Sequence, residues 1–139
     1  MHKNSEGYAD LTAGAAMSRM MKEYRKQQRK YYAYKNRRKI YVASKYAGDE
    51  EKNVKNAIGY CRRVIEQGHM PLASHLLYPQ MLDDTNPEER KMGRMFGMAL
   101  LGICDEVWVF GEISSGMAEE IREAKTMKKT LRYFGEENA

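Results

Sequence analysis

Residues 105–134 read DEVWVFGEISSGMAEEIREAKTMKKTLRYF and decide the fold of this chain. Residues 107–110 are a continuous apolar run of β-branched and aromatic side chains, which is typical of a strand covered on both faces of a parallel sheet. Two glycines and two serines follow at residues 111–116, so the backbone can turn tightly and a serine can cap the next helix. The stretch predicts a strand, a turn, a helix and a second strand.

The predicted helix carries an apolar stripe beside a carboxylate. Met117, Ile121 and Ala124 fall at i, i+4 and i+7. Glu119 points away from this stripe, whereas Glu120 lies on its flank in the first turns, where the helix dipole favours the ionised form. First-turn glutamates are common for that reason alone, so position leaves open whether Glu120 is catalytic or only stabilises the helix.

The preceding sequence alternates strands and helices in the same way. We predict strands at residues 39–44 and 70–74, a helix at residues 49–67 capped by Asp49, and a helix that begins at Asn86 and Pro87. The predicted apolar faces of these two helices are Val54, Ile58, Cys61 and Ile65, and Met92, Met95, Phe96 and Ala99, with Gly93 and Gly97 permitting close packing. The order predicts a doubly wound, Rossmann-like α/β fold with a parallel sheet of about four to five strands.

The N-terminal segment differs in charge from the rest. The net charge of the 139 residues is +5, but residues 1–39 hold 11 Lys or Arg against 3 Asp or Glu, and residues 40–139 hold 13 against 16. We predict a basic tail and amphipathic helix at residues 1–37 and an α/β domain at residues 38–139. The residues on one face of that helix are Met17, Met21, Tyr24, Gln28 and Tyr31.

Two interpretations of this basic helix stay open. It packs on the domain or on a partner subunit, in which case we expect a homodimer or a higher homo-oligomer. Alternatively, its interleaved Tyr and Lys or Arg side chains contact nucleic acid. No apolar run approaches the roughly 18 residues of a membrane span, and no signal-peptide core is present, so we expect a cytoplasmic protein without a membrane partner.

Loops at the carboxyl ends of the predicted strands locate a binding crevice, because ligands of open parallel sheets bind there. The site residues that these loops supply are Ser44, Tyr46, His75, Tyr78, Gly111, Ser114, Ser115, Gly116 and Glu120. His75 has the alternative role of capping a turn, and Tyr46 that of a packing lid. No His, Cys and carboxylate cluster has metal-ligand spacing, and Cys61 and Cys104 are expected to be reduced. SKYAGDEE after the first strand has one glycine, which disfavours NAD chemistry, and we expect no cofactor.

The motif SxGMxxEIxxA with KKTLRY, at residues 114–133, resembles the nucleoside 2-deoxyribosyltransferase-like family. KIYVAS at residues 39–44 is similar to the first strand of that family, so the resemblance spans roughly residues 38–134. It implies that Glu120 is the nucleophile. Gly116, Ile121, Ala124 and Lys129 also stand at matching places, whereas Met117 replaces the usual threonine or serine.

The resemblance implies glycosyl transfer through a covalent intermediate on a ribosyl or deoxyribosyl unit. Nucleoside-acting members carry an aspartate where Ser114 stands and another in the helix before the third strand, where residues 90–101 hold no acid. The general acid is therefore unassigned, with His75 or Asp84 as replacements. Relatives that hydrolyse nucleoside 5′-monophosphates have serine at this place and hold the phosphate with it.

The resemblance therefore implies an N-glycosidase or deoxyribosyltransferase-like enzyme that cleaves the base–sugar bond of a nucleoside 5′-monophosphate. Its small-molecule partner would be a nucleotide or nucleoside. Two other classes of function stay open: a catalytically silent nucleotide-binding or sensing domain, which would explain the missing acid, and a nucleic-acid-associated accessory protein, which would explain the basic helix.

Overall fold

The computed structural model describes residues 11–135. Contacts within the chain define two units, residues 1–37 and residues 38–139, and each is described by itself. The described part of the first unit is helix α1 (Leu11–Lys35), which confirms the predicted N-terminal basic helix. The predicted tail at residues 1–10 lies outside the described residues. Within residues 11–135 no helix is both long enough and apolar enough to cross a membrane.

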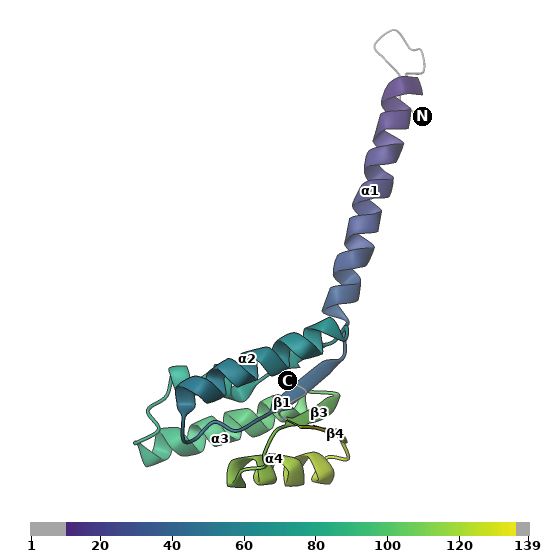
Figure 1. The fold of residues 1–139 in the computed structure, drawn as a ribbon. Coiled ribbons are helices and arrows are strands. Elements are labelled where there is room, and N and C mark those ends of the chain that lie inside the picture. Colours follow the sequence, from purple (N-terminus) through teal and green to yellow (C-terminus); the bar gives the residue numbers. More distant parts are fainter. Residues whose placement is uncertain (1–10, 136–139) are drawn as a thin grey trace. The chain divides into compact units, whose positions relative to one another are not determined.

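The second unit alternates strands and helices along the chain (Figure 1). Its elements are β1 (Lys39–Ala43), α2 (Glu50–Glu66), β2 (Met70–Leu72), the short 3-10 helices η1 (Ser74–Leu76) and η2 (Tyr78–Gln80), α3 (Pro87–Gly102), β3 (Glu106–Phe110), α4 (Ser115–Thr126) and β4 (Thr130–Phe134). The four strands pair in the order β2-β1-β3-β4, and every pair is parallel. The predicted doubly wound α/β fold is therefore confirmed. β2 ends two residues before the predicted Ser74 because the chain turns there into η1.

Helices cover both faces of the sheet, and alternate residues of β1 and β3 enter two separate cores. The buried residues of the core under α2 are Ile40, Val42, Tyr60, Val64, Ala73, Trp108 and Phe110. The buried residues of the core under α3 and α4 are Tyr41, Ala43, Leu101, Cys104, Val107, Val109, Met117, Ile121 and Ala124. Both faces of the two central strands are thus buried, as their apolar runs predict.

Local side-chain caps start the three helices of this unit where the sequence places them. Asp49 Oδ1 accepts a hydrogen bond from the backbone N–H of Lys52 at 3.3 Å. Asn86 Oδ1 accepts from the N–H groups of the first turn of α3, at 3.0 and 3.2 Å. Ser114 Oγ accepts from the N–H of Met117 at 3.3 Å. Each cap satisfies a donor that the helix itself leaves unpaired.

The predicted apolar face of α2 is partly correct, because Val54 and Cys61 are half-buried and Cys61 packs against the core. Ile58 and Ile65 are 55% and 39% exposed, whereas Ala57, Tyr60 and Val64 are buried. The reason is packing: the Tyr60 ring stacks on Phe110 of β3 with the ring centroids 4.5 Å apart.

The predicted apolar face of α3 is wrong. Met92, Met95 and Phe96 are exposed, and the helix buries Gly97 and Leu101 instead. A Cβ added at Gly97 would lie at an ordinary van der Waals distance, 3.5 Å, from Cβ of Ser74, whereas one added at Gly93 would lie 3.3 Å from Cδ1 of Leu82, so only Gly93 packs more tightly than an alanine would. Whether the exposed side chains contact a second copy of the chain stays a prediction, like the homo-oligomer itself.

Glu106 opens β3 and is the buried acceptor for three donors. Trp108 Nε1 and Arg132 Nε donate to Oε1, both at 3.1 Å, and Arg38 Nε donates to Oε2 at 3.2 Å. Burial alone would raise the pKa of this carboxyl, but the indole and the two guanidinium groups hold it below its ordinary value. The residue therefore joins the starts of β1, β3 and β4.

We expect Glu106→Ala to lower the free energy of unfolding by about 2 kcal/mol at pH 7, because the buried indole N–H loses its acceptor. The folded-state pKa is lowered from 4.5, so this stabilisation is present above that pH and is lost below it. Urea titrations at pH 7 and pH 3.5 measure both effects. Glu112→Ala, an exposed change in the turn after β3, is the control, and equal losses for the two variants would contradict the assignment.

Candidate active site

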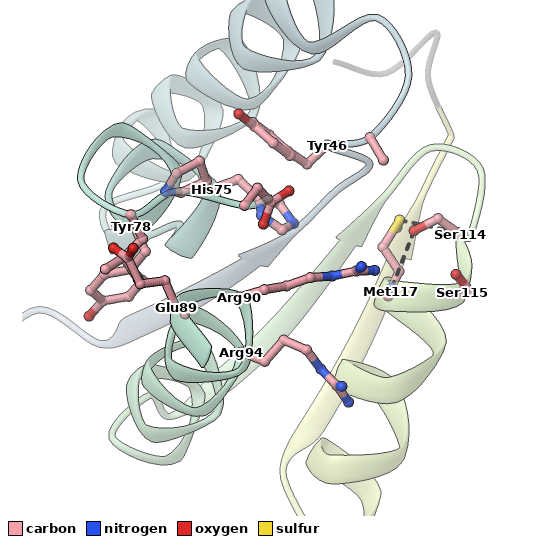
Figure 2. Close-up of a pocket in the computed structure, with 15 residues that line it drawn as sticks. Tyr46, His75, Tyr78, Glu89, Arg90, Arg94, Ser114, Ser115 and Met117 are labelled. Atoms are coloured by element: carbon pink, nitrogen blue, oxygen red, sulfur yellow. Dashed lines mark hydrogen bonds between the residues drawn. The ribbon is translucent and has the colours of Figure 1, made fainter. Parts of the chain in front are cut away.

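A pocket of about 290 Å³ lies at the carboxyl ends of the strands (Figure 2). The predicted site residues that line it are Tyr46, His75, Tyr78, Ser114, Ser115 and Gly116. They come from the loops after β1, β2 and β3, and from the first turn of α4. The remaining lining residues are Ala47, Pro79, Leu82, Asp84, Glu89, Arg90, Gly93, Arg94 and Met117.

Three predicted site residues are not on the pocket wall. Ser44 is buried, and its backbone takes part in a hydrogen bond with His75. Gly111 has a φ of 74°, which favours glycine, and its N–H donates to the carbonyl of Phe134 at 2.9 Å. Ser44 and Gly111 therefore stabilise the loops through backbone hydrogen bonds and do not contact the pocket. Glu120 lies behind the wall.

Glu120 is a buried carboxylate one helical turn beyond the pocket residues of α4. It is 7% exposed, and its Oε1 lies 3.9 Å from Nε2 of His75, which does line the pocket. Within the described part of the chain its buried Oε2 has no hydrogen-bond partner. Buried carboxylate oxygens are seldom left without a donor, and the Tyr41 hydroxyl is one donor that interacts with this carboxyl.

Burial decides the ionisation of this carboxyl. Desolvation raises the pKa of Glu120 from 4.5 to about 7, the nearby Tyr41 hydroxyl lowers it, and the charge of Glu119 raises it. The sequence predicted the opposite direction from the helix dipole. The dipole contributes only about 0.3–1 kcal/mol at such a position, which is less than the cost of removing a carboxylate from water. Glu120 therefore titrates near neutral pH.

His75 and Tyr46 form one side of the pocket. Their rings stack with centroids 5.2 Å apart and an interplanar angle of 26°. Burial lowers the pKa of His75, although the hydrogen bond to the Ser44 backbone and the charge of Asp84 oppose that shift. The neutral imidazole is then the prevailing form at pH 7, and it can exchange a proton with a neighbour.

Two arginines of α3 form the other side, and the sequence interpretation missed them. Figure 2 shows Arg90 and Arg94 both extending from α3 toward α4. Arg94 Nη2 donates to Oε2 of Glu119 at 2.6 Å, whereas within residues 11–135 no ion pair engages Arg90. Arg90 therefore places a positive charge on the wall of the pocket that Ser114 also lines.

The start of α4 adds unpaired donors to that charge. The first-turn N–H groups of Ser115 and Gly116 have no carbonyl of their own helix to bind, and both residues line the pocket. The positive end of the helix dipole lies at the same place. With Arg90 opposite, this end of the pocket favours an anion, such as a phosphate.

A periodic signal for the missed residues exists in the sequence. Glu89, Arg90, Gly93 and Arg94 fall at i, i+1, i+4 and i+5, which is one face of a helix. All four residues lie on α3, the helix that follows the long loop. They reach the pocket because α3 packs beside α4. The hydrophobic pattern of α3 instead predicted that its opposite face, with Met92, Met95 and Phe96, packs inward.

The comparisons with known proteins agree with this architecture. Residues 38–134 match the family described as a domain of unknown function, DUF7768, and the chain belongs to this family. The second unit is similar in fold to the 2-deoxyribosyltransferase of the psychrotolerant bacterium Bacillus psychrosaccharolyticus. The TM-score is 0.59, the sequence identity is 17%, and the match covers 70% of this chain and 72% of the other. No curated protein sequence matches the chain.

The fold is thus that of a distant 2-deoxyribosyltransferase-like domain, as the sequence motifs indicated. At this identity the likeness concerns the fold. Among residues 11–135 no three His, Cys, Asp or Glu side chains are grouped as ligands of a metal ion.

The raised pKa of Glu120 predicts a pH-dependent stability difference. The folded protein holds a proton between pH 4.5 and about 7 that the unfolded chain releases, so stability falls as the pH rises through this range. Glu120→Gln keeps the shape of the protonated carboxyl and removes this loss. We expect the variant to be more stable than the natural protein by about 2–3 kcal/mol at pH 8 and nearly equal at pH 5.

Denaturant titrations at the two pH values measure this difference. Glu123→Gln on the same helix is the matched control, and it should show no change between pH 5 and pH 8. A pH-independent effect of Glu120→Gln would mean that the carboxyl is ionised throughout this range.

Proposed function

We propose that this protein cleaves the N-glycosidic bond of a nucleoside 5′-monophosphate, with Glu120 as the nucleophile. The observation that carries the proposal is the buried, unpartnered Oε2 of Glu120 beside a pocket whose other end favours an anion. The motif around Glu120 and the 2-deoxyribosyltransferase-like fold support the same class of reaction.

In the proposed reaction the sugar lies in the pocket beside His75. The ionised Glu120 attacks the anomeric carbon, a Glu120–sugar ester forms, and the bond between that carbon and the base nitrogen breaks. The electron pair of that bond leaves with the base, which takes up a proton. Water, or a second base in the case of transfer, then attacks the anomeric carbon and frees the carboxylate.

The phosphate is proposed to lie at the start of α4. Ser114 replaces the aspartate of nucleoside-acting relatives, and the first-turn N–H groups with Arg90 supply donors and positive charge. Ser114 Oγ already accepts from the N–H of Met117, so its hydroxyl hydrogen is free to be donated to a phosphate oxygen.

The proton donor for the leaving base comes from the pocket wall. His75 and Asp84, the two residues suggested by the sequence, both line the pocket, and so does Glu89. Asp84 and Glu89 lie at the side of the pocket formed by the long loop and the start of α3. A base that binds at this side meets a carboxyl group as well as the stacked rings of Tyr46 and His75.

A silent nucleotide-binding domain is the alternative. One observation favours it: Glu120 is only 7% exposed and does not itself line the pocket, so attack requires that the ligand reach past His75 and Met117. Such a domain would bind the nucleotide without releasing its base.

Glu120→Gln should abolish release of the base while the ligand still binds, because the amide cannot form the ester. In the natural protein, release should increase as the pH rises through about 7, where Glu120 ionises. Chromatography of the free base measures turnover, and calorimetry measures binding.

Glu119→Gln is the neighbouring control and should retain most of the activity. The assignment is wrong if both variants turn over like the natural protein, or if only Glu119 matters. Tight nucleotide binding without any base release by the natural protein would favour the silent domain.

A nucleoside monophosphate should bind more tightly than its nucleoside. Charge-assisted hydrogen bonds contribute about 1.5–3 kcal/mol each, which corresponds to about tenfold to a hundredfold in affinity. Ser114→Asp should erase or reverse this preference, because it restores a negative charge beside the phosphate. Arg90→Gln should reduce the preference for the monophosphate without lowering the affinity for the nucleoside.

Calorimetric titration of both ligands tests the phosphate site. Arg122→Gln, an exposed change on α4 away from the pocket, is the control for a general loss of positive charge. Equal affinities for the two ligands in the natural protein would exclude the nucleotide and return the choice to a nucleoside or another small molecule.

A further inference from the structure

Helix α1 has two chemically different faces. At about 100° per residue, six basic side chains fall within an arc of about 140°. These six form the basic face, which is Arg19, Lys22, Arg25, Lys26, Arg29 and Lys30. Methionine and tyrosine side chains occupy an arc of about 100° on the opposite side, namely Met17, Met20, Met21, Tyr24 and Tyr31. Six of the seven basic residues of α1 therefore lie on one side of the helix, and only Lys35 lies on the other.

The chain itself does not neutralise the basic face. All six side chains are exposed, and within residues 11–135 none of them forms an ion pair with an acidic side chain. The single acid of α1, Glu23, lies at the edge of the arc. Six like charges this close repel one another, so a polyanion that binds them also removes that repulsion.

We propose that the basic face of α1 binds the phosphate backbone of double-helical DNA from within the major groove. From Arg19 to Lys30 the helix rises about 17 Å, and DNA presents one phosphate for every 1.7 Å or so of its axis. About ten phosphates therefore lie within this length, more than the six side chains require.

The distribution of side chains favours a duplex over a single strand. Binding to single strands relies on aromatic side chains that stack on bases, but the basic arc contains none. The tyrosines lie on the opposite face or beside the arc. Contacts that consist of charge alone are made to phosphates and do not depend on base sequence.

Groove dimensions favour DNA over RNA. The major groove of B-DNA is about 12 Å wide and admits an α-helix, whereas the major groove of A-form RNA is too narrow for side chains to enter. An arc of about 140° on a helix about 10 Å wide lets long Lys and Arg side chains reach both walls of the groove.

A membrane surface is a poorer match for the same helix. An interfacial helix must bury a continuous apolar face in the lipid, and here Gln28 and the polar ends of two tyrosines interrupt that face. The anionic phosphates of DNA satisfy the basic face without requiring burial of the other one.

Fluorescence anisotropy of the full chain with a labelled 20-base-pair DNA of arbitrary sequence tests the proposal. For six phosphate contacts the logarithm of the association constant should fall with the logarithm of salt concentration with a slope of about −5, so affinity drops about a thousandfold between 50 and 200 mM salt. A second DNA of different sequence should bind equally.

Two matched variants each carry six Lys or Arg to Gln changes, one on the basic face and one on the second unit. Replacing all six residues of the basic face should lower affinity at 50 mM salt by more than about a hundredfold, and replacing Arg19, Lys22 and Lys26 alone should halve the slope. The control replaces six exposed basic residues of the second unit, Lys52, Lys55, Lys91, Arg122, Lys125 and Lys128. It has the same net charge and should keep the slope of the natural protein.

Several results would overturn the proposal. If the control and the basic-face variant lose the same affinity for DNA, the binding depends on the net charge of the chain and not on the basic face. A slope shallower than about −2, or tighter binding to an RNA duplex of the same length, would exclude the major-groove contact. Binding to vesicles of seven parts phosphatidylcholine and three parts phosphatidylserine, without binding to DNA, would assign the face to a membrane.

Discussion

The second unit depends on the position of β1 and β3, which lie side by side at the centre of a parallel sheet. The helices that follow these two strands pack on opposite faces of the sheet. After β1 the chain enters α2 on one face, and after β3 it enters α4 on the other, so the two loops diverge and leave a crevice between them. Tyr46 follows β1 and Ser114 follows β3, which places them on the two sides of that crevice. This arrangement is possible only because both strands are apolar on both faces.

The sequence predicted the elements of the fold well because their signals are local. A continuous apolar run marks a strand buried on two faces, and Asp49, Asn86 and Ser114 each cap the helix that follows. The orientation of α2 and α3 was not predictable in the same way. Each helix offers two apolar stripes about one residue apart, and the choice between them depends on long-range packing, such as Tyr60 on Phe110.

The site shows the same division between local and long-range information. Six of the nine predicted site residues line the pocket, because loops at the ends of adjacent strands necessarily meet there. Arg90 and Arg94 were missed because their role requires α3 to present its polar face to α4. For Glu120 the helix dipole predicted a lowered pKa, but the pKa is raised. The dipole contributes about 1 kcal/mol, which is less than the cost of burying the charged carboxylate in the tertiary structure.

Burial of Glu120 has a consequence for where charge can be placed in this pocket. Ionising a carboxylate in a buried site costs free energy, and in the proposed reaction the positive charge that develops on the sugar in the transition state would offset that cost. A phosphate beside it would act in the opposite direction and keep the carboxyl protonated. Ser114 and Glu120 are six positions apart, about 9 Å along the helix axis, and Arg90 lines the same pocket as Ser114. In the proposed complex Arg90 would match the phosphate charge at that distance, and the carboxylate would still ionise near neutral pH. The proposed reaction therefore depends on both the arginine of α3 and the buried glutamate of α4.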